Sequence, residues 1–416
     1  MTDPVDPARA ARAAAQLKRR YAAERRFKAL GFLAVAFSAI VLAFLLWTMT
    51  STGLGGFKRT ELRFDIDFAS GLLTVDPSQL RGDSAMQTLE GAGLKDVVQF
   101  AAAQTAGDQA AAELQSDAWR EVAQALIADP SRLSGKLAVS LPVTKDMAAA
   151  RRGDGPEGLR PLAARLKAEG KLVRVFDLGF LSRADATDPQ SVGIWGALKG
   201  SMLTMLVTLL LAFPVGVLAA VYLEEYAPKN RWTELIEVSI NNLAAVPSII
   251  FGLLGLAVFL GLFPNWRSAP LIGGMTLALM TMPVIVISGR NAIKAVPPSI
   301  RDAALAVGAS RVQETFHHVL PPALPGILTG TIIGMARALG ETAPLLMIGM
   351  RAFVATPADG FTSPSTVLPV QIFLWSDEID RGFVERTSAA IIVLLLFLLA
   401  MNGIAIYLRN RFEKRW

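Results

Sequence analysis

The sequence predicts an all-α polytopic membrane protein with six transmembrane helices and an inserted mixed α/β domain between helices 1 and 2. Hydrophobic residues form 52% of the chain and charged residues only 18%. Six stretches are long and apolar enough to cross a hydrocarbon core. The region 51–193, between the first two stretches, is polar and long enough to form a small domain. This composition excludes an ordinary soluble enzyme.

The predicted spans are separated by loops of very different length. They lie at about Leu30–Met49, Leu198–Leu223, Leu243–Phe263, Leu271–Ser288, Ile327–Ile348 and Ser388–Leu408. The first transmembrane helix, 29–50, follows a basic N-terminal segment, 1–28, as a start-transfer helix does. A cleaved signal peptide is the alternative, but its apolar region usually has about 7 to 15 residues and its leader is shorter. The other five spans fall within 194–408.

The distribution of lysine and arginine predicts the orientation of the spans. With the N-terminal segment in the cytoplasm, alternation also places there the loops after Leu223 and Gly289 and the tail 409–416. These four segments carry 8, 2, 4 and 4 lysines and arginines, whereas the two short loops on the other side carry 1 and 3. Because short cytoplasmic loops are enriched in these residues, both termini are predicted to be cytoplasmic.

The inserted region 51–193 shows both strand and helix patterns. FDIDF at 64–68 alternates like a strand, and LVRVFDLGFL at 172–181 is a second candidate. The alanine-rich stretch 108–127 predicts a helix, with Pro130 beyond it as a stop signal. The region contains no histidine, and we identify no site chemistry in it. It is interpreted either as a spacer or as a docking surface for an extracytoplasmic partner.

The predicted cytoplasmic segment between the fourth and fifth spans is expected to form a short rigid helix at about 299–320. Pro297 and Pro298 precede it, and Asp302 suits its early positions. The alanines that follow Asp302 favour helix throughout. Leu320 and Pro321 are expected to begin the exit from this helix.

The fifth predicted span contains an arginine and a glutamate, Arg337 and Glu341, four residues apart. An ionised arginine near the middle of a bilayer costs roughly 2.5 to 3.5 kcal/mol, so something must compensate it. Helical geometry puts both residues within roughly 40° of one line, on a stripe that also carries three glycines. These glycines are Gly326, Gly330 and Gly334. Spaced glycines let another helix approach closely, so this stripe is predicted to face protein or a water-filled cavity.

Two interpretations of the pair remain open. In the first, Arg337 and Glu341 neutralise each other at i, i+4 spacing and only brace the helix bundle. In the second, which we favour because ionisable residues inside membranes usually mark pathways, Arg337 donates forked hydrogen bonds to an oxyanion. Glu341 then holds the arginine in place and keeps the site from trapping the anion. Thr342 is assigned to the same pathway.

No motif predicts that this chain catalyses a reaction. The sequence has no cysteine and only two histidines, the adjacent His317 and His318, so neither a metal site nor a histidine-activated nucleophile is expected. The Gly-Lys pairs at 135–136 and 170–171 are followed by leucine and lack the earlier glycine of a phosphate-binding loop. We therefore expect no catalytic residue, and no cofactor, metal or nucleic acid bound by this chain.

The predicted cytoplasmic helix carries a spaced motif. Its residues are Asp302, Ala303, Ala304, Gly308, Leu320 and Pro321. The motif resembles the EAA, three residues, G, about eleven residues, LP signature of permease subunits of binding-protein-dependent ABC importers. Asp302 replaces the glutamate, and His318 stands where isoleucine is usual, which either weakens packing or exposes His318. The resemblance implies the type I importer (MetI-like) permease fold and a coupling helix that inserts into a partner ATPase, where ATP and Mg bind.

Four further segments narrow the resemblance to the A-type permeases of phosphate-specific (Pst) importers. They are ARALGETAPLL at 336–346, VYLEEYAPKNRW at 221–232, AVPSIIFGLLG at 245–255 and LPVQIF at 368–373. The resemblance implies translocation of inorganic phosphate across the lipid bilayer of the bacterial cytoplasmic (inner) membrane. It also implies three partners: a C-type permease subunit, an ATPase dimer and an extracytoplasmic phosphate-binding protein. A homodimer of this chain is the alternative to the C-type partner.

Two other functions stay open on the sequence alone. One is a permease for another oxyanion, such as molybdate, sulfate or phosphonate. The other is a membrane-anchored sensor or scaffold, in which the inserted domain would be the functional part and no coupling helix would be needed. An intramembrane enzyme is disfavoured, because no nucleophile and base stand at a useful spacing.

Overall fold

The computed structural model describes residues 7–82, 84–350 and 353–412. Parts of the predicted cytoplasmic ends, 1–6 and 413–416, lie outside the described residues. The chain divides into two compact units, 1–52 and 53–416. The inserted region and the later spans therefore belong to one unit, although the sequence predicted a boundary near 193.

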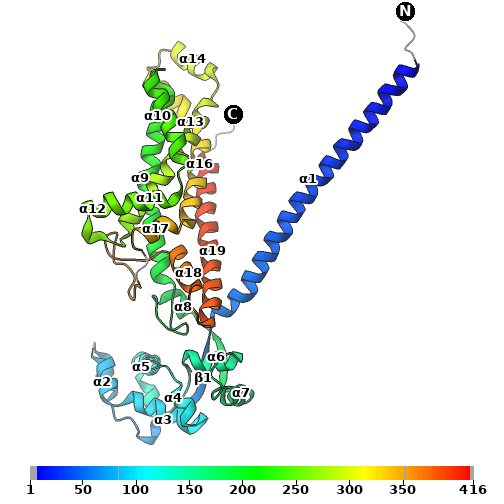
Figure 1. Ribbon diagram of the computed structural model, residues 1–416. Coiled ribbons are helices and arrows are strands. Elements are labelled where there is room, and N and C mark those ends of the chain that lie inside the picture. The colour runs from blue at the N-terminus through cyan, green and yellow to red at the C-terminus, as the bar shows by residue number, and fades with distance from the viewer. Residues whose placement is uncertain (1–6, 83, 351–352, 413–416) are drawn as a thin grey trace, which may run out of the picture. The chain divides into compact units, whose positions relative to one another are not determined.

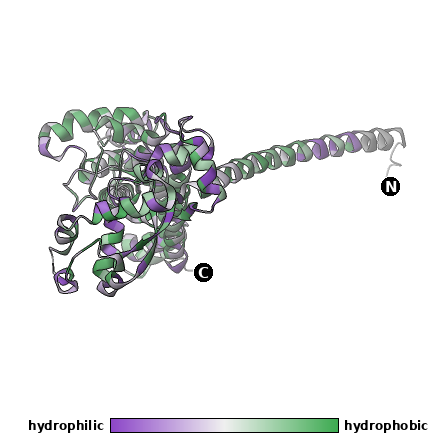
Figure 2. Cartoon of the chain, turned by 90° about the horizontal axis from the view of Figure 1, so that it is seen from below, coloured by the Kyte–Doolittle hydropathy of each residue, from purple (hydrophilic) through white to green (hydrophobic). Residues whose placement is uncertain are grey.

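The first unit consists of most of helix α1 (Pro7–Gly56). This helix contains the predicted span 29–50 and continues without a break through the basic segment before it. Figure 2 shows the change along α1 from hydrophilic residues on the N-terminal side to hydrophobic residues. Within the hydrophilic part, Lys28 Nζ lies 2.6 Å from Glu24 Oε1, an exposed i, i+4 pair. Such pairs and the many alanines favour helix outside the bilayer.

The inserted region is built on a three-stranded antiparallel sheet in the order β2-β1-β3. The strands are β1 (Lys58–Asp67), β2 (Lys136–Pro142) and β3 (Leu172–Phe176). Along β1, Leu62, Phe64 and Ile66 are buried, whereas Arg63 and Asp65 are exposed. This alternation puts one face of the sheet into a hydrophobic core of its own.

Short helices complete that core (Figure 1). They do not include α8 (Gly179–Ser182), whose buried Phe180 packs with Trp375 and Phe383 in another cluster. The α-helices of this core are α2 (Ala85–Gly91), α3 (Leu94–Ala106), α4 (Asp108–Ala112), α5 (Trp119–Ala128), α6 (Lys145–Arg152) and α7 (Arg160–Ala168). Three 3₁₀ turns, η1 (Phe68–Ser70), η2 (Pro77–Arg81) and η3 (Pro130–Ser134), connect them. The predicted FDIDF strand lies in β1 except for Phe68, and the predicted strand 172–181 ends at Phe176.

The predicted helix 108–127 is interrupted in the structure. Residues 113–118 separate α4 from α5, because this stretch pairs with the end of β2. Leu114 forms an antiparallel bridge with Val143, and the Gln115 amide donates to the Pro142 carbonyl at 3.0 Å. A contact with a distant segment thus overrides a locally favourable helix. The strand β2 itself was not predicted.

Four long helices follow the inserted region and run side by side in Figure 1. They are α9 (Trp195–Val221), α13 (Pro270–Lys294), α16 (Leu320–Gly340) and α19 (Arg381–Phe412). With α1, and with adjoining turns counted, five helices of the described chain are long and apolar enough to cross a membrane. A sixth is reached only if one bent pair of helices is counted as a single span. The shorter elements of this region are η4 (Tyr222–Tyr226), η6 (Pro264–Trp266), α17 (Ala343–Met347) and α18 (Leu368–Ser376).

The bent pair replaces the straight span predicted at Leu243–Phe263. Helix α10 (Arg231–Ala244) ends before Pro247, and the chain resumes as α11 (Ser248–Leu254), π-helical η5 (Gly255–Phe259) and α12 (Leu260–Leu262). The two parts are bent by 104°. A residue that precedes proline avoids helical geometry, and proline lacks the N–H that would continue the helix, so the break falls here.

The fifth predicted span, Ile327–Ile348, is also displaced. The helix that contains it begins at Arg311 and ends at Gly340. Glu341 has an extended backbone, with ψ of 118°, and α17 starts only at Ala343. Pro344 cannot donate to the Gly340 carbonyl and disfavours helix at the residue before it. Residues 341–348 therefore do not continue the membrane helix.

A buried arginine at the start of α19 joins the inserted region to the last span. Arg386 donates to the Gly56 carbonyl at 2.6 Å, the Pro189 carbonyl at 2.7 Å and Asp177 Oδ2 at 3.0 Å. The side chains of Arg386 and Asp177 are only 2% and 1% exposed. Nearby, Arg174 Nη2 lies 2.5 Å from Glu385 Oε2. We call this set of contacts the Arg386 junction, and it explains why no compact boundary occurs near 193.

Replacing Asp188 with asparagine is expected to stabilise the protein at pH 7. Burial raises the pKa of the Asp188 carboxyl, which accepts from the Gln190 amide at 2.8 Å and from Gln115 Nε2 at 3.3 Å. A raised folded pKa means that stability is lost as pH rises from the ordinary carboxyl value, about 4, through the folded value. The gain in melting temperature over the unmodified protein should shrink as the pH falls toward 4. A pH-independent gain would contradict this explanation.

Candidate functional site: the α14 knob and the Arg337 pair

The predicted coupling helix at about 299–320 is two helices in the structure. The first, α14 (Pro298–Ala306), ends because Gly308 adopts a left-handed backbone with φ of 89°. A second helix then begins after Ser310, whose side chain and that of Gln313 form a capping box. This helix runs through α15 (Arg311–Gln313) and η7 (Glu314–Val319) into α16. Leu320 and Pro321 thus lie inside the continuing helix and do not mark its exit.

The turn η7 is π-helical, and two prolines follow it at once. Pro321 and Pro322 have no N–H, so the carbonyls one turn earlier lose their usual partners. A wider turn accommodates such a loss within a helix. The helix from Arg311 to Gly340 is therefore continuous but locally irregular before the span.

Helix α14 is tied to the end of α13 by Arg301. Its guanidinium donates to the Val296 carbonyl at 2.7 Å, the Ile293 carbonyl at 3.0 Å and Glu225 Oε1 at 2.9 Å. A cation at these carbonyls also complements the negative end of the α13 dipole. Across the same region, the Tyr226 hydroxyl donates to Thr315 Oγ1 at 3.2 Å. These contacts fix α14 relative to two membrane helices.

A second ionic group surrounds the end of α13. Arg290 lies 3.4 Å from Glu224 Oε2 and 2.6 Å from Glu237 Oε1, and Lys294 lies 3.6 Å from Glu224 Oε2. The sequence did not predict a role for these residues or for Arg301 and Glu225. The paired glutamates directly after an apolar run were the signal that could have found them, since charges at span ends need partners.

The surface of α14 and of the turns after it is largely apolar. Asp302 and Ala303 are exposed, whereas Ala304 is buried. Four large apolar side chains around them are exposed, and these are Leu305, Val307, Val312 and Phe316. A groove of about 640 Å³ lies between α14 and the following helix, lined in part by His317, His318 and Pro321. We call α14, the Gly308 turn and this groove the α14 knob. Of the two alternatives for His318, weakened packing or exposure, the structure shows exposure.

The Arg337 pair forms at the end of α16. Arg337 Nε lies 3.5 Å from Glu341 Oε1, and the two side chains are 48% and 19% exposed. The ions therefore meet, but Glu341 does so from an extended residue after the helix and not from the predicted helical stripe. Thr342 caps α17 without a side-chain hydrogen bond to its backbone. The pair lies at the break between α16 and α17, and α17 packs against α11 with Pro344 beside Gly252.

The three glycines of the stripe face α13. A Cβ atom at Gly326 would lie 2.6 Å from the Ala292 Cβ, and one at Gly334 would lie 3.0 Å from Thr281 Cγ2. A Cβ atom at Gly330 would overlap Ser288. Arg337 is three residues beyond Gly334, about 60° away from its line by helical geometry. Its guanidinium consequently leaves the packed face and is half exposed, which is unusual inside a membrane helix.

Replacing Gly330 with alanine is expected to destabilise the bundle by about 1 to 3 kcal/mol, because overpacking forces α16 away from α13. Thermal unfolding in detergent measures the effect. The matched control is Gly340→Ala, since nothing lies within 4 Å of a Cβ atom at that position. The double variant Gly330→Ala/Ser288→Gly should recover most of the loss, and an equal loss in both single variants would contradict the close packing.

The described residues contain no group of three or more His, Cys, Asp or Glu side chains able to hold a metal ion. The Arg337 pair offers a cation within the membrane helices. The α14 knob offers an apolar surface fixed to α13.

Comparison with known protein families divides the chain into two matched regions. Residues 212–416 match the family described as binding-protein-dependent transport system inner membrane component. Residues 14–159 match a domain of unknown function, DUF3333. The first match includes both the Arg337 pair and the α14 knob. The second covers most of α1 and most of the inserted region.

Individual relatives agree with the first match. A probable ABC transporter permease, YqgI of Bacillus subtilis, is 36% identical over 44% of this chain and 61% of its own length. The phosphate transport system permease protein PstA of Yersinia pestis is 31% identical over 51% of this chain and 71% of its own. PstA of Haemophilus influenzae is 31% identical over 50% of this chain and 73% of its own. The inward-facing MetNI methionine ABC transporter aligns at 16% identity and a TM-score of 0.41, covering 53% of this chain and 95% of that one. The family match and the two PstA relatives, each 31% identical over more than two thirds of its own length, show that the chain belongs to the family of inner membrane components of binding-protein-dependent transport systems, as a permease subunit of the ABC importers.

Proposed function

We propose that this permease subunit translocates inorganic phosphate across the bacterial inner membrane. The observation that carries the proposal is Arg337, a half-exposed arginine on a membrane helix whose only ion pair in the described chain is a 3.5 Å contact with Glu341. A guanidinium binds phosphate oxygens through two parallel hydrogen bonds. The PstA relatives support phosphate as the anion.

Arg337 and Glu341 divide the task between them in this proposal. Arg337 attracts the anion and offers the forked donor. Glu341 competes for the same guanidinium, so the anion is held weakly enough to leave, as translocation requires. Arg337 thus pairs with Glu341 when the site is free and with the anion when the site is occupied. Thr342, next to Glu341 in the chain, is a further hydroxyl donor.

The α14 knob couples the membrane helices to an ATPase dimer that binds ATP and Mg. Its apolar side chains would be buried in a groove of that partner, since exposed apolar patches of this kind mark interaction sites. Arg301 connects the knob to the end of α13, and the glycine stripe connects α13 to α16, which carries Arg337. Movement of the knob is thereby transmitted to the anion site through packed helices.

The remaining features complete an importer. The bent pair α10 to α12 serves as the third of six spans, and both termini lie in the cytoplasm. The inserted region then lies outside the cytoplasm, where a phosphate-binding protein delivers the anion. A C-type permease subunit completes the pathway opposite this chain.

Purification of the chain with its native neighbours and reconstitution into vesicles tests the proposal. We expect ATP-dependent uptake of labelled phosphate that excess unlabelled phosphate abolishes. Competition by molybdate, sulfate or phosphonate at lower concentration than phosphate would assign another oxyanion. Absence of a nucleotide-binding subunit in the purified complex would contradict the importer role itself.

The double variant Asp302→Ala/Gly308→Val is expected to uncouple ATP hydrolysis from transport. Valine at the left-handed position of Gly308 strains the turn by about 1 to 2 kcal/mol and displaces α14. Uptake should fall at least about tenfold, while ATP hydrolysis by the complex continues. The matched control is Asp96→Ala/Gly93→Val in the inserted region, where Gly93 also has a positive φ, of 81°. Coupled uptake by the first variant at the control's level would show that the knob is wrongly assigned.

A further inference from the structure

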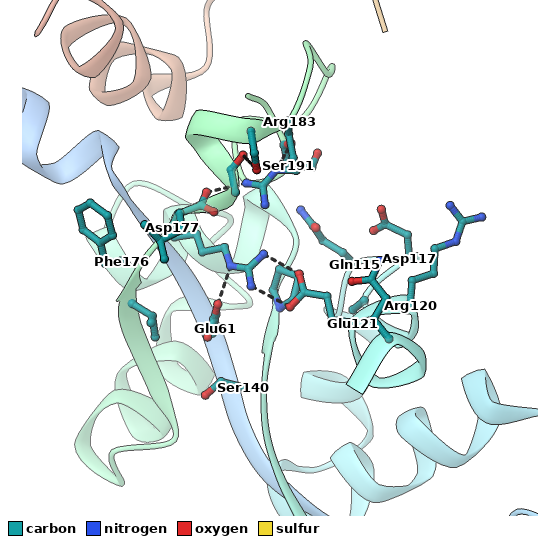
Figure 3. Close-up of a pocket in the computed structure, with 18 residues that line it drawn as sticks. Glu61, Gln115, Asp117, Arg120, Glu121, Ser140, Phe176, Asp177, Arg183 and Ser191 are labelled. Carbon is teal, nitrogen blue, oxygen red and sulfur yellow. Dashed lines mark hydrogen bonds and ion pairs between the residues drawn. The ribbon is translucent and has the colours of Figure 1, made fainter. Parts of the chain in front are cut away.

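Several arginines outside the membrane helices are neutralised by carboxylates. Figure 3 shows a polar pocket of the inserted region, where Arg59 donates to both oxygens of Glu121 at 2.6 and 2.8 Å. In the same pocket, Arg183 donates to Asp177 Oδ2 at 2.6 Å. Arg267, in the loop before α13, is different. It is exposed, and its guanidinium has no hydrogen bond or ion pair with the residues that the structure describes.

The position of Arg267 in the sequence does not explain its charge. It is the single lysine or arginine in the short loop between the third and fourth predicted spans. This loop is predicted to lie outside the cytoplasm, where topology does not favour basic residues. The flanking stretches 248–266 and 268–289 contain no charged residue, so no carboxylate nearby in the chain neutralises the arginine. Neither orientation in the membrane nor local pairing therefore accounts for it.

The backbone directly after Arg267 is strained. Among the described residues, Ser268 is the one residue other than glycine with a positive φ, of 63°. Such a conformation is unfavourable for a residue with a Cβ atom and persists only where the surrounding contacts hold it. Ser268 is buried, its hydroxyl donates to the Gly349 carbonyl at 2.5 Å, and its carbonyl accepts from the Ser365 amide at 2.9 Å. These contacts fix the direction of the chain at Arg267.

Gly349 provides the space in which the Arg267 side chain lies. A Cβ atom at Gly349 would lie 2.8 Å from Arg267 Nε and 3.3 Å from its Cγ. Gly349 also ends α17 with a left-handed backbone, at φ of 93°. The amides of Gly349 and Met350 donate to the carbonyls of Leu346 and Leu345, at 3.1 Å each. Arg267 donates to neither carbonyl, so hydrogen bonding to the end of α17 does not explain its position.

Arg267 and the Arg337 pair lie at opposite ends of one packed wall, formed by α17 and the chain from α11 onward. A Cβ atom at Gly252 would lie 2.6 Å from the Cα of Pro344, at the start of α17. A Cβ atom at Gly255 would lie 3.1 Å from Cγ2 of Ile348, at its end. Arg267 comes next along the wall, beyond Ile348. The seven residues 342–348 separate the two ends by roughly 10 Å at the rise of a helix.

We propose that Arg267 is a second anion-binding residue of this chain, which receives the anion on the outer side and passes it along the wall to Arg337. The inference rests on the proposed function and on the topology proposed with it. An exposed guanidinium without a carboxylate partner attracts an oxyanion over about one Debye length, roughly 8 Å at physiological ionic strength. The separation of the two arginines is of this order. Because Arg267 is exposed, it holds the anion weakly, and the anion can move on.

The test uses the complete importer in vesicles and its purified binding protein loaded with labelled phosphate. Arg267→Gln should lower the maximal uptake rate at least about tenfold, because a charge-assisted contact with the anion is lost. The concentration of binding protein that gives half-maximal uptake should not change. Arg267→Lys keeps the charge and should retain at least about a third of the rate. The matched control is Arg381→Gln, an exposed arginine on the same side, with a rate within about twofold of the unmodified complex.

Three results would overturn the inference. Uptake by Arg267→Gln at the level of the control shows that Arg267 has no role in transport. A higher half-maximal concentration at an unchanged maximal rate shows that Arg267 contacts the binding protein and not the anion. A lower melting temperature that lysine does not restore shows a structural role. An unmodified complex that imports no anion removes the proposed function and the inference together. If it imports another oxyanion, only the phosphate assignment fails, and a tenfold loss of that import in Arg267→Gln still supports the anion-binding role.

Discussion

Replacing Arg337 with alanine is expected to reduce ATP-dependent phosphate uptake by about 100-fold or more. The forked contact consists of two charge-assisted hydrogen bonds, each worth roughly 1.5 to 3 kcal/mol, and about 2.7 kcal/mol corresponds to 100-fold in rate. The complex should remain assembled, because the side chain of Arg337 is half exposed and is not packed against α13. Uptake into vesicles and the amount of assembled complex are measured on the same preparation.

Two companion variants separate anion binding from bracing. Arg337→Lys keeps the charge but loses the fork, so uptake should be partly retained at a higher phosphate concentration. The double variant Arg337→Ala/Glu341→Ala removes both ions. If the pair only braces the bundle, the double variant should transport better than Arg337→Ala, since no unpaired carboxylate remains. If Arg337 binds the anion, both variants should be equally inactive. Normal uptake by Arg337→Ala would exclude a pathway role.

The positions of the membrane helices could largely be predicted, because apolar runs of this length have few alternatives. What the runs did not predict is where helices break. Both errors in the spans occur beside a proline, Pro247 in the third and Pro344 in the fifth. Prolines Pro214 and Pro283 lie inside helices that continue. A proline alone therefore does not decide between a break and a continuous helix, and the packing around it does.

In the inserted region, the sequence predicted the local elements but not the contacts between distant segments. Its sequence predicted a mixture of strand and helix, since alternation in β1 is a local signal. It did not predict the pairing of residues 114–115 with the end of β2, which depends on contacts between distant segments.

The site residues were predicted unevenly for a related reason. Arg337 and Glu341 stand out because charge is rare in an apolar run, and their separation is small enough for contact in either backbone geometry. Arg301 and Arg386 are as important to the structure, but they lie among other charged residues near span ends. Nothing in a single sequence distinguishes a buried arginine there from a solvated one.

Replacing Arg386 with methionine is expected to lower the free energy of unfolding by about 3 to 5 kcal/mol, the usual loss when one partner of a buried ion pair is removed. Methionine has a similar length but leaves the carbonyls of Gly56 and Pro189 without their donor. Asp177 keeps its bond to Arg183 at 2.6 Å, so it is not left fully unpaired. Thermal unfolding in detergent and proteolysis of the loop 183–193 report the loss.

The matched control for Arg386 lies on the same helix. Arg381 pairs with Asp154 at 3.0 Å, also in the inserted region, but its side chain is largely exposed. Arg381→Met should therefore cost at most about 1 kcal/mol.

Equal losses in the two variants would mean that charge near the start of α19 matters and burial does not. A loss confined to Arg386→Met, with the inserted region cleaved before the spans unfold, would show that one arginine joins the two parts into a single unit. The helix α19 would then move together with the inserted region, because Arg386 joins them through three hydrogen bonds closed to water.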